Sequence, residues 1–206
     1  EMDRLLAETR GWPAGLVIAA NEYRRKAAGN TGATRLNDNL QAAFSSYFKE
    51  EVLALQPKAM REFLLDTSVL DELTPVSCAA VTGDSHENTK ATLESAFRAG
   101  LFLEPVDRER CCYTYHPLLR RTLLKELNHA TPARAAALHR RASAHYAESG
   151  ERLAAIEHAN LCGDPTFLAD QLDLLANELI YAGYLYRIDD LGSELPLSIV
   201  SLRPML

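Results

Sequence analysis

The chain has 206 residues, of which 47% are apolar and 24% charged, and its formal net charge is −6 at pH 7. That length allows one or two globular domains, and the acidic excess argues against nucleic-acid binding, which usually requires a basic face. No apolar run approaches the ~20 residues of a membrane-spanning helix and no signal peptide opens the chain, so we expect a cytoplasmic protein without membrane contact.

Residues 1–28 are predicted to be helical, with one interruption at the sequence GWPAG, because proline and glycine break or start helices. The chain opens with EMDRLLAE, which resembles the middle of a helix, so we expect it to be a piece of a longer protein. Residues 29–37 contain glycines and small polar residues and are predicted to be a linker.

Residues 38–128 predict a domain that begins with short helices. The first has apolar residues at helical spacing, the third has a threonine cap followed by proline, and the fourth ends at a glycine. The apolar positions of the first are Leu40, Phe44, Tyr47, Phe48 and Leu55. The predicted helices cover 38–55, a stretch from Pro57, a stretch from Pro75 after the Thr74 cap, and 86–99 before Gly100.

The hydrophobic pattern then changes from helical to strand-like. The runs LFLEP and CCYTY are rich in β-formers and flank the polar sequence VDRER, which predicts a β-hairpin. A helix from Pro117 to about Leu127 closes the domain. Short helices, a hairpin and a closing helix are the order of a winged-helix domain, so we predict that fold for 38–128.

Residues 131–206 predict antiparallel helices separated by short breaks. A cap and a proline, Thr131 and Pro132, open this region as Thr74 and Pro75 open the earlier helix. Paired helices of this length are typical of an α-solenoid with TPR-like repeats, so the predicted fold class is mainly α. The helices are expected at 132–148, 152–162, 165–182 and 184–194.

Few residues point to catalysis. The chain has no phosphate-binding glycine loop, no G-x-S-x-G and no H-E-x-x-H, so it is predicted not to be an enzyme. His139, His145 and His158 do not share a helix face, and we expect partly exposed helical histidines and no metal site. The basic pairs, such as Arg120–Arg121 and Arg140–Arg141, are expected to be solvated. The four cysteines include no C-x-x-C and indicate a reducing environment.

His116 occupies the joint between the second predicted strand and the helix that starts at Pro117. A helix N-terminus presents free N–H groups and the positive end of the helix dipole, which favour anions. A histidine at this position could donate a hydrogen bond to a phosphate. It could equally be a capping residue at the edge of the core, and the local sequence leaves both interpretations open.

Four stretches together resemble the MalT-like, large LuxR-type transcriptional activators, which are signal-transduction ATPases of the STAND class. They are GWPAGLVIAA, FLLDTSVLDELTPVSCAAVTG, LFLEPVDRERCCYTYHPLLRRTLLKEL and LHRRASAHYAESGERLAAIEHANLCGD. The resemblance implies that 1–28 is the end of the helical domain of an ATPase module, that 38–128 is the winged helix, and that 131–206 begins a helical superhelix.

The resemblance also implies roles for two residues. Pro13 would pack against the adenine of a bound nucleotide, and His116 would contact the β-phosphate of ADP, as in M-H-D-L-L-R switches. This chain has Pro117 where that motif has aspartate, which puts the role of the aspartate in doubt. Both contacts are expected only in a full-length protein that binds ATP or ADP, and this piece is expected to hold no cofactor.

The expected function is therefore that of a regulatory, non-catalytic part of an ATP-dependent LuxR-type activator. Its expected partners are the intramolecular ATPase core and an inducer or regulatory protein at the superhelical region, with DNA contacted only by a separate downstream domain. Two alternatives remain: a stand-alone helical scaffold that binds a protein, and a winged helix that binds DNA. The charge of 84–100 sums to −1, which disfavours the latter.

Overall fold

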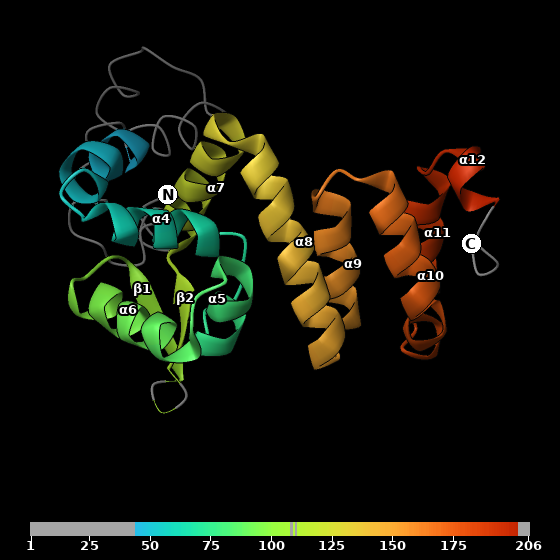
Figure 1. The fold of residues 1–206 in the computed structure, drawn as a ribbon, viewed down its shortest axis with the longest axis horizontal. Coiled ribbons are helices and arrows are strands. Elements are labelled where there is room, and N and C mark those ends of the chain that lie inside the picture. Colours follow the sequence, from blue (N-terminus) through green and yellow to red (C-terminus); the bar gives the residue numbers. More distant parts are fainter. Residues whose placement is uncertain (1–43, 108, 110, 202–206) are drawn as a thin grey trace, which may run out of the picture.

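The computed structural model describes residues 44–107, 109 and 111–201. The predicted segments 1–28 and 29–37, together with Pro13, lie outside these ranges. The described chain is mainly helical, with a small antiparallel hairpin followed by a row of helices, which confirms the predicted fold class (Figure 1). Its elements are η1 (Phe48–Leu53), α4 (Lys58–Thr67), α5 (Pro75–Thr82), α6 (His86–Arg98), β1 (Leu103–Asp107), β2 (Cys112–Tyr115), α7 (Pro117–Ala130), α8 (Pro132–Ser149), α9 (Arg152–Leu161), α10 (Pro165–Tyr181), α11 (Leu185–Ser193) and α12 (Leu197–Val200).

The first described helix changes its winding. Residues 44–47 are α-helical and continue into the π-helix η1, where the Ala54 N–H donates to Lys49 O, five residues back. Phe44 and Phe48 are buried and stack on each other, with ring centroids 6.0 Å apart. The expectation that Leu55 belongs to this apolar face is wrong, because η1 ends at Leu53 with Ala54 as its C-cap, and Leu55 is 77% exposed.

The hairpin packs against the short helices as the predicted winged helix requires. β1 and β2 are antiparallel, with Leu103 opposite Tyr115. The Leu73 N–H donates to Tyr113 O at 2.7 Å and the Tyr113 N–H donates to Leu73 O at 3.0 Å. β2 therefore lies between β1 and the loop that precedes α5, and α6 contacts both α5 and β1.

A first hydrophobic cluster fills this half of the described chain. Its side chains come from the first helix, α4 to α7 and both strands, and it extends onto α8. Leu64, Leu70, Leu93 and Leu119 lie at its centre and are fully buried. The α8 residues that join it are Ala135, Leu138 and Ala142.

Helices α8 to α11 lie side by side in chain order, extending away from the winged helix (Figure 1). A second hydrophobic cluster joins α9, α10 and α11, and the predicted apolar face of α10 is buried in it. That face consists of Leu168, Leu172, Leu175 and Leu179. None of the helices in the described ranges is long and apolar enough to cross a bilayer.

Candidate functional site

His116 is the N-cap of α7, the helix that follows β2. Its backbone N–H donates to Phe102 O at 2.9 Å, and its carbonyl accepts from the Arg120 N–H at 3.0 Å. The ring nitrogen Nδ1 accepts a hydrogen bond from the Leu118 N–H at 3.3 Å. Both main-chain groups and one ring nitrogen are thus fixed by the strand–helix joint.

His116 is buried, with only 4% of the residue exposed. It stacks on Phe44 with a centroid separation of 6.4 Å and an interplanar angle of 19°. Phe102, which accepts from the His116 backbone, meets Phe44 edge-on at 5.9 Å. In this chain His116 is therefore a buried capping residue, as one of the two interpretations of the sequence expects, and its contact with a nucleotide stays a prediction.

The end of β2 is anchored to α4 through buried hydroxyl groups. The Tyr115 hydroxyl lies 2.6 Å from Thr67 Oγ1 and 3.4 Å from Leu64 O. Thr67 Oγ1 in turn donates to Phe63 O at 2.7 Å, one turn earlier in the same helix. Burial raises the pKa of Tyr115 far above its usual range. The neutral phenol thus fixes the strand that leads into His116.

Arg120, one turn after His116, ties α7 to the end of α4. Its Nε donates to Ser68 O at 3.1 Å and its Nη2 donates to Val69 O at 3.2 Å. Its Nη1 lies 2.5 Å from the Asp71 carboxylate. Carbonyls at a helix C-terminus lack helical partners and attract cations. The guanidinium therefore stabilises the C-terminal end of α4 and orients the start of α7.

Three arginines of the basic pairs contact other parts of the chain, although Arg140 and Arg141 are exposed, as expected of solvated side chains, and Arg120 is half-buried. Besides Arg120, Arg141 on α8 donates to Val81 O at 2.9 Å and connects α8 to α5. Arg140 pairs with Asp164 and lies over the Phe167 ring, 4.1 Å from its centroid. These side chains join helices whose proximity the sequence does not reveal.

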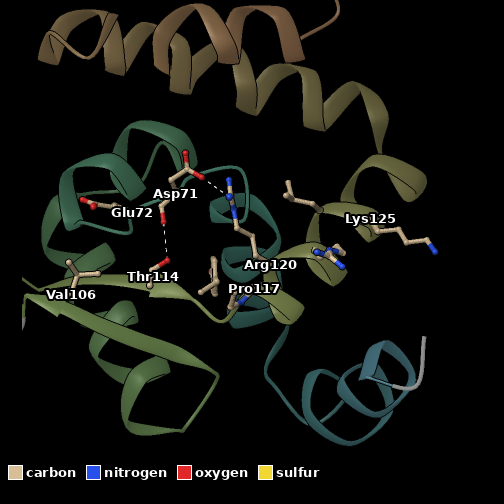
Figure 2. A pocket seen from close by; sticks show the side chains of 10 residues that line it. Asp71, Glu72, Val106, Thr114, Pro117, Arg120 and Lys125 are labelled. Atoms are coloured by element: carbon tan, nitrogen blue, oxygen red, sulfur yellow. Dashed lines mark hydrogen bonds and ion pairs between the residues drawn. The ribbon is translucent and has the colours of Figure 1, made fainter. Parts of the chain in front are cut away.

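A cavity of about 790 Å³ lies beside Arg120, between the hairpin and α7 (Figure 2). Its acidic wall carries Asp71, whose carbonyl accepts from the Thr114 hydroxyl at 3.2 Å. The lining also includes two exposed basic residues of α7, Arg121 and Lys125. The remaining lining residues are Glu72, Val106, Tyr115, Pro117, Arg120 and Leu124.

A second cavity, of about 460 Å³, adjoins the first and shares Asp71, Arg120 and Leu124 with it. His139 of α8 and His158 of α9 line it, and their Nδ1 atoms are 3.0 Å apart. Each of these two residues is only 5% exposed. The expectation of separate, partly exposed histidines is therefore wrong for this pair, because antiparallel packing of α8 and α9 brings them together.

The environment of the pair keeps both rings neutral. Burial lowers the pKa of His139, and the positive charge of Arg120 lowers it further. Burial also lowers the pKa of His158, to about 4, with a smaller contribution from His139. The Tyr146 ring stacks on His158 with centroids 5.2 Å apart. A contact between two neutral imidazoles requires one ring to donate and the other to accept.

Metal binding finds no support in the part of the chain that the structure describes, where no group of three or more histidine, cysteine or acidic side chains could hold an ion. The cysteines are free thiols: Cys78, Cys111, Cys112 and Cys162. Burial raises the pKa of Cys78 to about 12 and also raises that of Cys112, beside Glu72. Both thiols are therefore poor nucleophiles at neutral pH.

Comparison with known proteins relates a part of this chain to a known winged helix domain. Residues 49–135 match the family model of the MalT winged helix domain. The serine/threonine-protein kinase PknK of Mycobacterium tuberculosis, in two strains, and of Mycobacterium bovis is 31% identical to this chain over 209 residues. That similarity covers 100% of this chain but only 18% of the length of each relative. The chain is thus similar to the MalT winged helix domain over residues 49–135 and to a part of PknK over its whole length.

Proposed function

Because residues 49–135 match the MalT winged helix domain, we propose that this chain is the regulatory, non-catalytic part of an ATP-dependent LuxR-type transcriptional activator. It would couple the nucleotide state of an ATPase core to a superhelical sensor region. The same module could serve a protein kinase, the name that the mycobacterial relatives carry. In either setting it would work in the cytoplasm as a part of a longer chain.

The observation that carries the proposal is the position of His116. The N-terminus of α7 orients its ring through the Leu118 N–H. The residue before it, Tyr115, is hydrogen-bonded to α4, and Arg120, four residues after it, binds the carbonyls at the end of α4. This is a fixed support for an imidazole that contacts a phosphate when the winged helix folds back on the ATPase core. Since His116 is only 4% exposed here, the contact requires the residues that cover its ring to move aside in the closed state.

The test is His116→Ala in the full-length protein. A hydrogen bond to a charged phosphate contributes about 1.5–3 kcal/mol, and about 1.4 kcal/mol corresponds to a tenfold change in an equilibrium constant. If the bond forms only in the ADP-bound state, its loss accelerates ADP dissociation by roughly ten- to a hundred-fold and raises output without inducer. ADP dissociation and basal reporter transcription are measured on the same variant.

His116→Asn is the matched control, because asparagine is a good N-cap and can still accept from the Leu118 N–H, while it lacks the imidazole. The proposal expects both substitutions to accelerate ADP release, although only the alanine variant loses the cap. If ADP release is unchanged in both variants and only His116→Ala melts at a lower temperature, His116 is a structural cap and the proposed role is wrong.

A second candidate function, a stand-alone scaffold that binds a protein, is favoured by the surface of the last helices. Exposed apolar side chains are a common feature of protein-binding surfaces. The large apolar side chains exposed on α10 to α12 are Leu174, Ile180, Tyr181, Leu185, Tyr186 and Leu197. Under the first proposal the same surface would receive an inducer or a regulatory protein. The flanking coding sequence distinguishes the two, since only the first requires a Walker motif upstream and a LuxR-type helix-turn-helix downstream.

A further inference from the structure

The interface between α8 and α9 separates the two hydrophobic clusters. The α8 residues Ala135, Leu138 and Ala142 belong to the cluster of the winged helix. The second cluster begins with Ala155 on α9 and continues through α10 and α11. Tyr146, near the end of α8, packs against both clusters. We refer to this α8–α9 interface as the seam, and it is where the repeats join the winged helix.

Two of the buried contacts across the seam are polar. The Ser143 hydroxyl donates to Ala155 O at 2.8 Å, and Ser143 is completely buried. Four residues earlier on α8, His139 contacts His158 of α9, with 3.0 Å between their Nδ1 atoms. Hydrogen bonds between buried polar groups depend on protonation state in a way that apolar packing does not.

We propose that His139 and His158 form an acid-sensitive latch in the seam, which holds α9 and the helices after it against α8 when both rings are neutral and releases them when the rings are protonated. Release leaves α8 and α9 without their mutual packing, so that their backbone amides open more readily. The latch is independent of the proposed role of His116.

The geometry explains why protonation opens the latch. A neutral pair can share one proton between the two Nδ1 atoms, whereas two imidazolium rings would point N–H groups at each other across 3.0 Å. Protonation would also place charge in a site where each residue is 5% exposed, and burying an uncompensated charge is costly.

The charged groups around the pair do not compensate for this charge. Arg120 from α7 is positive and lowers the pKa of both histidines. Asp71, from the loop after α4, would favour the charged form of His158 but is paired with Arg120. Glu157 on α9 has the same tendency but forms two contacts of 2.7 Å with Arg187. Tyr146, which stacks on His158, has a pKa raised to about 12 and stays neutral.

The direction of the pH effect follows from proton linkage. An open seam exposes His158 to water, where its pKa is about 6.5, so the open state binds more protons below that pH. Stability of the closed seam is thus fully present above about pH 6.5 and is lost as the pH falls toward the folded value of about 4. With these two values, the opening constant rises about 30-fold between pH 8 and pH 5.

Amide hydrogen exchange of the 206-residue chain tests the latch, with each rate corrected for the intrinsic effect of pH. We expect protection factors in α8 and α9 to fall about 30-fold between pH 8 and pH 5, while those in α4 to α7 change less than about threefold. The double variant His139→Leu/His158→Leu should abolish this difference. The control His129→Leu, at an exposed position near the end of α7, should retain it.

If the double variant does not fold, an NMR pH titration of the histidine rings in the unmutated chain tests the latch instead. His139 and His158 should titrate below the ordinary histidine pKa of about 6.5, and their titration should coincide with the loss of protection in the seam. The latch is refuted if the seam stays closed after both rings are protonated, or if acid removes protection from α4 to α7 to the same extent.

Discussion

Tyr115→Phe should destabilise the chain although it removes a single oxygen. The hydroxyl is buried, 2.6 Å from Thr67 Oγ1 and 3.4 Å from Leu64 O. Its removal leaves the Thr67 hydroxyl with one partner fewer, at an expected cost of about 1–2 kcal/mol in the free energy of unfolding. Urea denaturation measures the change, and Tyr181→Phe, at a residue that is 92% exposed, should stay within about 0.5 kcal/mol.

The double variant Tyr115→Phe/Thr67→Val refines this expectation. Replacing both partners of a buried hydrogen bond by apolar groups costs less than the two single changes added together. Additive costs would instead mean that the two hydroxyls do not interact in solution. This residue pair joins β2 to α4 and thereby supports the strand that leads into His116.

The residues whose position could be predicted are those with partners close in sequence. His116 is predicted at a strand–helix joint by the residues next to it, and the structure places it there as the N-cap. The contacts of Arg120 lie 51 and 52 residues away, so no local pattern indicates them. His139 and His158 are 19 residues apart, on either side of the break between α8 and α9. Aligning these two predicted helices as an antiparallel pair could have predicted their contact.

Two helices, α5 and α8, begin with a threonine followed by proline. Replacing the threonine by alanine should change the free energy of unfolding by different amounts in the two helices. The Thr74 hydroxyl accepts from the Ser77 N–H at 3.0 Å, and Ser77 Oγ accepts from the Thr74 N–H at 3.0 Å. In the described structure the Thr131 side chain makes no such bond to the first turn of α8, and its hydroxyl donates back to Leu127 O at 3.2 Å.

Thr74→Ala should therefore lower the free energy of unfolding by about 0.5–2 kcal/mol, the usual cost of losing an N-cap. Thr131→Ala is the matched control and should cost less, within about 0.5 kcal/mol. Thermal or urea unfolding of both variants measures the difference. Equal losses would show that the reciprocal bonds of α5 add nothing beyond the proline start.

Element boundaries were predictable where caps and breaks are local. The starts and ends of α8, α9, α10 and α11 lie within one residue of the predictions, because glycine or proline marks them. The predicted helix from Pro117 stops too early, since α7 runs on to Ala130. The π-winding of η1 is not visible in the sequence, because its apolar spacing is compatible with an ordinary α-helix.

For the molecule as a whole, the two clusters imply that core substitutions act locally. Leu172→Ala in α10 and Leu119→Ala in α7 each remove a fully buried side chain and should cost about 2–5 kcal/mol. Leu172→Ala should raise hydrogen exchange in α9 to α11 and leave α4 to α7 protected. Equal loss of protection in both halves would mean that the chain unfolds as one unit.

The order of elements, short helices, a hairpin and then paired helices, was predictable because the spacing of apolar residues and the positions of glycine and proline indicate it. The hydrophobic cluster to which α8 belongs was not predictable, since its small apolar residues could pack against either the winged helix or the following helices. Only the three-dimensional packing shows that Ala135, Leu138 and Ala142 complete the cluster of the winged helix.

Because α8 completes the cluster of the winged helix, it affects how the chain folds while it is being made on the ribosome. The winged helix ends in sequence with α7, but its hydrophobic cluster still lacks the side chains of Leu138 and Ala142 when Ala130 has just emerged. At about 5–20 residues per second, α8 follows on the order of a second later. During that interval the nascent winged helix exposes the surface that α8 will cover, and only its closure provides the face against which α9 can dock.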